Sequence, residues 1–185
     1  VQLGNGTGGI NTVTSGDIDI DAGGAITTGN TITTAGNGNI AIDTTAGGIT
    51  LSNAVTANGA GTVTLNANQL LTVNAAVSST TGALNLTGGT GVTHDANGDL
   101  TTGGTGTIDV TATANDITMV DGTVYTADTG AVTLSAATNI ATGRVTSNGT
   151  QTATATAGNI TDVTAGEGAG NENFAGTVVT LTAGT

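Results

Sequence analysis

The residues best suited to chemistry form a short acidic segment at residues 94–99, with the sequence HDANGD. Asp95, Asn97 and Asp99 place side-chain oxygens two residues apart, as calcium-binding loops do. Calcium takes about six to eight oxygen ligands, and loops of the EF type carry glycine at the sixth position and glutamate at the twelfth. Counted from Asp95, those positions hold leucine and glycine. The segment therefore predicts either a partial calcium site or a solvated Asn-Gly turn.

A second candidate is the acidic segment 167–174 (EGAGNENF), which contains both glutamates and the only phenylalanine. It lies in an irregular part of the sequence, where we expect residues 166–175 to form a loop insertion. Insertions of this kind emerge on one face of a repeat protein, often the binding face. The segment therefore predicts either a tolerated bulge or a loop that contacts a ligand such as a glycan. The candidate contact residues are Glu167, Asn171, Glu172, Asn173 and Phe174.

Catalysis is not expected from this composition. Asp17, Asp19 and Asp21 alternate with isoleucines, so all three carboxylates face outward on one predicted strand. Paired carboxylates can hydrolyse glycosides, but a sugar-cleaving site also needs cations or aromatic platforms. The chain has one arginine, one tyrosine and one phenylalanine. His94 has no serine or cysteine nucleophile arranged around it and is predicted to be a surface turn residue. We expect neither an enzyme nor a cofactor, calcium excepted.

The charge balance excludes two classes of partner. Thirteen acidic residues face a single basic one, Arg144, which gives a formal net charge of -12. Binding to nucleic acid or to an anionic membrane surface requires clusters of Lys and Arg. No hydrophobic run approaches the roughly 20 residues that span a bilayer, so membrane insertion is not expected either. With no Cys and no Pro, the chain has no disulfide framework and nothing that interrupts paired strands.

The elements that position these residues follow from a repeat. Eight glycines recur at steps of 19 to 27 residues: Gly16, Gly38, Gly61, Gly82, Gly106, Gly130, Gly149 and Gly176. The first six are followed, two and four residues later, by Ile18/Ile20, Ile40/Ile42, Val63/Leu65, Leu84/Leu86, Ile108/Val110 and Val132/Leu134. Alternation of this kind predicts a strand with one buried face, and the long period predicts stacked coils.

Two further aliphatic positions follow in each coil. The second is Ile26, Ile49, Leu71, Val92, Ile117, Ile140 or Ile160. The third is Ile32, Val55, Val77, Leu100, Val124 or Val145. Three strands per coil, separated by Gly-rich turns, predict an all-β fold in one continuous domain over residues 1–185. We expect a right-handed parallel β-helix, a three-faced β-solenoid of about eight coils of roughly 23 residues.

The two ends of the sequence are less regular. Leu3 and Ile10 fit the second and third strand positions, so the chain is expected to open in mid-coil. After Gly149 the inward positions hold Gln151 and Ala153, and a buried amide needs a partner. After Gly176 the aliphatic pair Val179/Leu181 comes one residue late. Neither end shows a cap, which predicts an interior segment of a longer repeat protein.

Hydroxyl-bearing residues follow the second and third anchors. They are Thr27, Thr50, Thr72, Thr93, Thr118 and Thr161 on the second strand, interrupted by Ala141. They are Thr33, Thr56, Ser78, Thr101, Tyr125 and Thr146 on the third. Such ladders suggest ice binding as a minor alternative. The residues before the second anchors are mixed, however, and so ordinary strand propensity explains the threonines better.

The repeats resemble those of filamentous-haemagglutinin-like adhesins. The clearest copies are residues 38–42 (GNIAI) with 48–50 (GIT) and 54–56 (AVT), and residues 61–65 (GTVTL) with 71–72 (LT) and 77–78 (VS). The resemblance implies a right-handed β-helix exported by two-partner secretion or as an autotransporter passenger. It further implies a location outside the cell or at the bacterial cell surface, where such a protein serves as the stalk of an adhesin.

Together these features predict a non-catalytic structural or adhesive rod. The alternative is a subunit of an extracellular filament or sheath, assembled by end-to-end stacking of coils. The expected partners are flanking repeats of the same chain or further copies of it, with a glycan or a cell-surface receptor as a possible ligand in either case. Nucleic acid is not among them.

Overall fold

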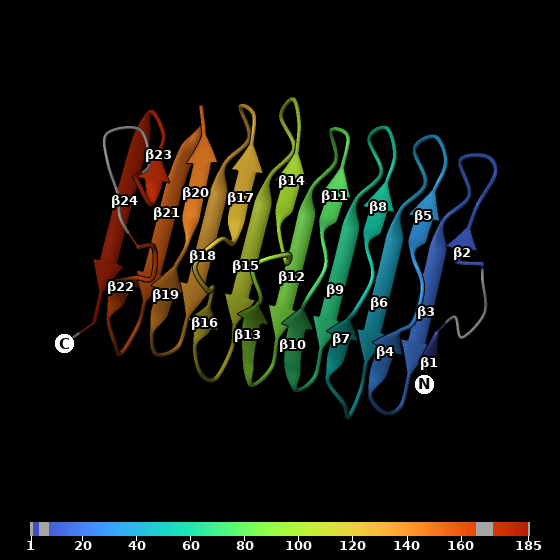
Figure 1. Cartoon of the computed structure of the whole chain (residues 1–185), viewed down its shortest axis with the longest axis horizontal. Coiled ribbons are helices and arrows are strands. Elements are labelled where there is room, and N and C mark those ends of the chain that lie inside the picture. Colours follow the sequence, from blue (N-terminus) through green and yellow to red (C-terminus); the bar gives the residue numbers. More distant parts are fainter. Residues whose placement is uncertain (1, 4–7, 166–171, 185) are drawn as a thin grey trace.

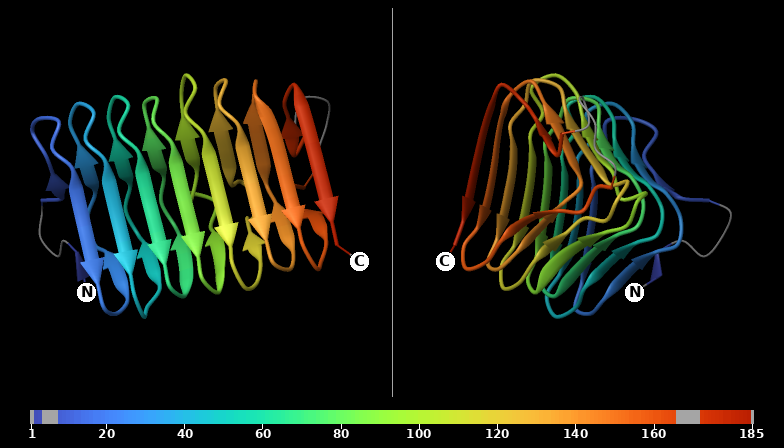
Figure 2. Two further views of the ribbon diagram at one scale, coloured as in Figure 1. Left: turned by 180° about the vertical axis from the view of Figure 1, so that it is seen from behind. Right: turned by 60° about the vertical axis from the view of Figure 1, so that its left-hand side comes forward.

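The computed structural model describes residues 2–3, 8–165 and 172–184, and these residues form an all-β solenoid. Successive coils stack along one axis, and each coil contributes one strand to each of three parallel sheets (Figure 1). Figure 2 shows the three faces in an oblique view along the stack. Among the described residues no helix is long and apolar enough to cross a membrane. The three parallel sheets confirm the predicted all-β class and three-faced β-solenoid, with seven complete coils in the described residues where about eight were predicted.

Within the part of the chain that the structure describes, each sheet contains eight strands. The first sheet comprises β3 (Ile18–Ala22), β6 (Ile40–Thr44), β9 (Val63–Ala67), β12 (Leu84–Gly88), β15 (Ile108–Ala112), β18 (Val132–Ala136), β21 (Thr150–Ala155) and β24 (Val178–Ala183). The second comprises β1 (Gln2–Leu3), β4 (Ile26–Thr28), β7 (Ile49–Leu51), β10 (Leu70–Val73), β13 (Gly91–His94), β16 (Ile117–Thr118), β19 (Ile140–Thr142) and β22 (Ile160–Asp162).

The third sheet comprises β2 (Ile10–Asn11), β5 (Ile32–Thr34), β8 (Val55–Ala57), β11 (Val77–Ser79), β14 (Leu100–Thr102), β17 (Val124–Ala127), β20 (Arg144–Ser147) and β23 (Phe174–Ala175). Strands β3 to β23 make seven complete coils, with β1 and β2 before them and β24 after them. We call the segment between the second-sheet and third-sheet strands of one coil its corner.

The core consists of aliphatic columns that run along the stack. Ile42, Leu65 and Leu86 pair in register on neighbouring strands and are buried. Their outward neighbours are more exposed, because successive side chains of a strand point to opposite faces. Each coil thus covers the apolar layer of the coil before it, which explains why single repeats of this composition need their neighbours to fold.

The predicted register also holds at the irregular ends. Leu3 lies in β1 and Ile10 in β2, as expected for a chain that opens in mid-coil. Gln151 is fully buried and pairs with Val132 on one side and Val179 on the other. Its Nε2 donates to the carbonyl oxygen of Ala175 at 2.6 Å. The amide nitrogen therefore has a backbone partner, whereas the buried Oε1 of Gln151 has no hydrogen-bond partner among the described residues.

The periodic glycines lie where successive coils approach most closely. At Gly61, Gly82 and Gly130 a Cβ atom would overlap the carbonyl oxygen of the corresponding glycine in the preceding coil. Buried hydroxyls cross-link the same turns, which join third-sheet strands to first-sheet strands. Ser79 Oγ donates to Gly61 O at 2.6 Å and accepts from Gly82 N at 2.8 Å. The glycines therefore recur once per coil because the stacked coils leave no room for a side chain at this position.

One strand is shifted by a residue from its predicted register. Tyr125, which we expected to face outward, is fully buried and pairs with Leu100 and Val145. Val124, predicted as the inward anchor, is half-buried and pairs with Arg144. The prediction was wrong because the spacing between inward residues is the same in these two coils. Ile117 pairs with Val92, and Tyr125, not Val124, pairs with Leu100. Thr126, paired with Thr101 and Thr146, continues the outward hydroxyl ladder.

Candidate functional site

The predicted calcium residues hold two successive corners together. Asp95 Oδ1 accepts a hydrogen bond from Asn97 N at 2.8 Å, which closes a tight turn. Asp99 Oδ1 accepts from Val124 N of the next coil, also at 2.8 Å. One oxygen of each carboxylate thus stabilises the protein backbone. Calcium binding by Asp95, Asn97 and Asp99 stays a prediction.

The second predicted site is described only in part, because Glu167 and Asn171 lie outside the described residues. Glu172 is exposed. Asn173 Nδ2 donates to the carbonyl oxygens of Thr142 and Gly143 and to Asp162 Oδ1, each at 3.0 Å. Phe174 begins β23 and packs against the core. Asn173 and Phe174 therefore fasten the returning chain to the stack, and ligand binding by the segment stays a prediction.

His94 is not a surface turn residue as predicted, because it lies inside the solenoid. Strand β13 alternates Val92 inward, Thr93 outward and His94 inward, and His94 is only 3% exposed. Its Nδ1 lies 2.8 Å from the carbonyl oxygen of Gly98, which can only accept, so Nδ1 carries the proton. Its Nε2 then accepts from the hydroxyl of Tyr125 at 2.7 Å. The alternation along β13 was the signal that could have placed it.

Burial keeps this pair neutral. Desolvation lowers the pKa of His94 from 6.5 to about 4, against the opposing effects of the Gly98 hydrogen bond and the Asp95 charge. Burial also raises the pKa of Tyr125 well above its usual value of 10. The two rings meet edge to face, with centroids 5.2 Å apart. The pair is a satisfied polar contact within the core and provides no route for proton exchange with a ligand.

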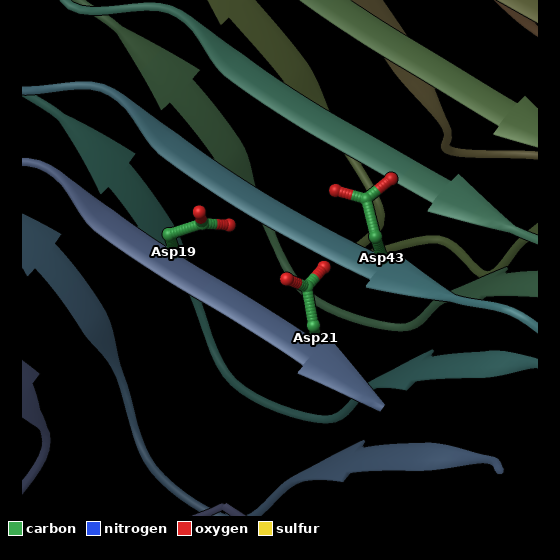
Figure 3. A group of neighbouring side chains, drawn as sticks. All are labelled: Asp19, Asp21 and Asp43. Atoms are coloured by element: carbon green, nitrogen blue, oxygen red, sulfur yellow. The ribbon is translucent and has the colours of Figure 1, made fainter. Parts of the chain in front are cut away.

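The outward carboxylates form a cluster that crosses two coils (Figure 3). Asp21 pairs directly with Asp43 on β6, and carboxylate oxygens of Asp19, Asp21 and Asp43 all lie within 4.8 Å of one another. Asp19 pairs with Ala41, so the strand of the next coil brings no second carboxylate directly opposite Asp19. Three carboxylates supply at most six oxygens, the lower limit of the about six to eight that calcium prefers, and surface acidic groups of this kind are common without an ion. The cluster is therefore described as an acidic surface patch.

Replacing Asp43 with asparagine is expected to stabilise the protein. Like charges directly opposite on neighbouring strands repel each other, and the substitution removes the charge opposite Asp21. We expect the Tm to rise by roughly 1–3 °C at low salt, and the rise to shrink in 1 M NaCl, where the Debye length is about 3 Å. Asp109→Asn is the matched control, because Asp109 pairs with Asn85 and Thr133. An equal effect in both variants would rule out repulsion within the cluster.

A surface hollow of about 210 Å³ lies at the corners of three successive coils. Its polar lining residues are Asp121 and Thr123 from the corner before β17, Arg144 at the start of β20, and Thr164 after β22. None of them was singled out as a ligand by sequence reasoning, although the 19-residue step between Gly130 and Gly149 marks the coil that lies behind the hollow. Among the candidate sites of the described chain, this one combines a concave shape with opposite charges.

The hydroxyl ladder of the second sheet has the predicted register, and the ladder of the third sheet has it except at Tyr125, where Thr126 takes the outward position. On the second sheet, Thr72 pairs with Thr50 and Thr93, and the interruption at Ala141 is present. Ser78 Oγ donates to Thr56 Oγ1 of the preceding coil at 3.2 Å. Hydroxyl pairs of this kind stabilise neighbouring strands, so the ladders need no ligand to explain them.

Comparison with protein-family models, with curated proteins and with solved structures finds no match.

Proposed function

We propose that this chain is a rigid, non-catalytic section of an extracellular rod, of the kind that forms the stalk of filamentous-haemagglutinin-like adhesins. The observation that carries the proposal is the continuity of the stack. Three parallel sheets run the length of the described solenoid. The core between them is filled by aliphatic side chains that lie in register along the stack. At about 4.8 Å per coil, the eight strands of each sheet give a rod of roughly 35–40 Å. Added coils would lengthen such a rod without changing its cross-section.

The composition supports a role outside the cell. A net charge of -12 keeps a rod soluble and separate from its neighbours. The sheet faces carry short Thr, Ser and Asn side chains, which pair with one another along the stack. The repeat resemblance points to the surface of a bacterium and to export by two-partner secretion or by an autotransporter route.

The rod proposal is tested by removing one whole coil. Deleting residues 61–81 joins the coil that begins at Gly38 to the coil that begins at Gly82 and keeps the strand order. We expect the variant to keep its β-sheet circular dichroism, and the maximum dimension from small-angle scattering to fall by roughly 5 Å. Deleting residues 61–70 breaks the register and is the matched control. If the whole-coil deletion unfolds as completely as the control, the stack is not the modular rod proposed here.

The surface location needs its own test. An antibody raised against the folded chain should label intact cells that produce the protein. Labelling that appears only after the cells are permeabilised would overturn the extracellular assignment and leave the rod proposal untouched.

A further inference from the structure

The hollow beside Arg144 arises from unequal corners. Residues 119–123 separate β16 from β17, whereas Gly143 alone separates β19 from β20 in the next coil. The short corner therefore recedes between the longer corner before it and the chain that follows β22. Solenoid coils tolerate such differences because corners do not take part in the sheet ladders. The result is a concave surface on an otherwise regular rod.

The walls of the hollow are held in place by hydrogen bonds. Thr123 is fully buried, and its Oγ1 donates to the carbonyl oxygen of Asp95 at 3.0 Å. Its own carbonyl oxygen accepts from Arg144 N at 3.0 Å. Thr164 is fastened by its backbone N and its hydroxyl to Asp162 Oδ1, at 2.6 and 2.7 Å. A hollow built on these bonds is pre-formed, which reduces the entropy that a ligand must lose.

Two glycines permit this geometry. Gly122 has φ +96°, a backbone conformation that side chains rarely adopt, and it turns the longer corner back toward β17. At Gly143 a Cβ atom would overlap the carbonyl oxygen of Thr123 and lie 3.2 Å from Met119 Cε. The receding corner thus depends on a residue without a side chain, and this fixes the depth of the hollow.

The chemistry of the hollow follows from its two charged residues. Arg144, the single basic residue among 185, lines it together with the exposed carboxylate of Asp121. A guanidinium offers five N–H donors in a planar fork that matches a carboxylate. Arg144 also interacts within the chain, and five donors allow it to hold a protein group and a ligand together. Asp121 accepts hydrogen bonds from hydroxyl groups.

We propose that the hollow binds a small hydroxylated monocarboxylate, such as one hexuronic acid unit of an acidic polysaccharide. Its carboxylate pairs with Arg144, and its hydroxyls donate to Asp121. The hollow is smaller than the roughly 300–1,000 Å³ of pockets for drug-sized ligands, and so it takes one ring. Dianions such as phosphate are disfavoured because Asp121 and the net charge of -12 repel them more strongly. This site does not depend on whether the rod belongs to an adhesin.

The test is a titration of the full chain with sodium glucuronate, followed by two-dimensional NMR. We expect saturable shifts confined to residues 121–124, 144 and 164–165, and at least tenfold weaker binding of glucose and of inorganic phosphate. Arg144→Gln should weaken glucuronate binding at least tenfold. Asp128→Asn is the matched control for a change of charge on a neighbouring turn and should bind as the parent does.

Three results would overturn the proposal. They are equal binding of glucose and glucuronate, tighter binding of phosphate, and unchanged binding by a folded Arg144→Gln variant. Should that variant lose its β-sheet spectrum, Asp121→Asn provides the second measurement. Asp121 is exposed, so its substitution is expected to leave the fold intact and to weaken glucuronate binding severalfold. Unchanged binding by Asp121→Asn would contradict its role as the acceptor.

Discussion

Gly82→Ala is expected to lower the free energy of unfolding by about 3 kcal/mol, which corresponds to a fall in Tm of roughly 6–12 °C. The added Cβ would overlap Gly61 O and lie 2.7 Å from Ala60 O, and both are backbone atoms of the preceding coil. Gly61 O also accepts the hydrogen bond of the buried Ser79 hydroxyl. The two coils can separate only by breaking their shared ladder, so the methyl group cannot be accommodated by rotating a side chain. Thermal and urea denaturation would measure the loss.

Gly23→Ala is the control for this prediction. Both substitutions add one methyl group and both restrict the unfolded chain, an effect that by itself stabilises slightly. Nothing lies within 4 Å of a Cβ at Gly23, and its φ is outside the left-handed region. Its free energy of unfolding should change by less than about 0.5 kcal/mol. Similar losses in the two variants would show that glycine flexibility, and not coil spacing, matters at position 82.

The steric collision at Gly82 explains why the fold could be predicted from the sequence. The same overlap recurs at Gly38, Gly61 and Gly130, so the close approach of the coils requires glycine at the same position of successive repeats. The aliphatic positions that follow are equally constrained, because a one-residue slip would turn each of them to solvent. Strand order, register and core columns all depend on these local constraints, and they were predicted correctly except for the register of β17.

Corners are not constrained in this way, and the errors lie there. The corner before β17 places Tyr125 and not Val124 inward, and His94 lies inward at the end of β13. Neither residue is apolar enough to be recognised as core from its type alone. Each is buried because the other satisfies its polar group, a contact between residues 31 positions apart. The pattern within a single coil does not indicate such a pair, because its two members lie in different coils.

The candidate site was missed for the same reason. The hollow beside Arg144 exists because a one-residue corner follows a five-residue corner, and its lining comes from three coils. The pairing of Asp21 with Asp43 likewise depends on the register of two coils. Surface features of a solenoid are therefore set by differences between neighbouring repeats, whereas its fold is set by what the repeats share.

The buried histidine predicts that stability will fall between pH 7 and pH 4. The pKa of His94 is about 4 in the folded protein and 6.5 when unfolded, so in this interval the unfolded chain binds a proton that the folded chain does not. Unfolding is therefore favoured as the pH falls. A difference of roughly 2.5 pH units corresponds to about 3 kcal/mol of stability, present in full above pH 7 and lost at pH 4. Urea denaturation at a series of pH values would measure it.

The upper part of this interval belongs to the imidazole alone, since His94 is the only histidine. Hydrogen bonds from Thr138 and Asn139 lower the pKa of Asp116, and hydrogen bonds from Thr164 and Asn173 lower the pKa of Asp162. The stability that these two carboxylates contribute is present in full well above their usual pKa of 3.8 and is lost progressively below about pH 5. A loss between pH 6.5 and about pH 5 is thus assigned to the imidazole.

Replacing His94 with leucine separates the titration of the ring from its packing. The variant leaves the Tyr125 hydroxyl and the Gly98 carbonyl without the imidazole, so we expect a loss of about 1–3 kcal/mol at pH 7. Its stability should nevertheless stay constant from pH 7 to about pH 5, above the range in which the carboxylates titrate. The double variant His94→Leu/Tyr125→Phe removes the unsatisfied hydroxyl and should recover part of the loss with the same flat profile. A slope that persists in both variants would mean that the acid sensitivity arises elsewhere, and a flat profile in the parent protein would mean that the buried imidazole accepts a proton without disturbing the core.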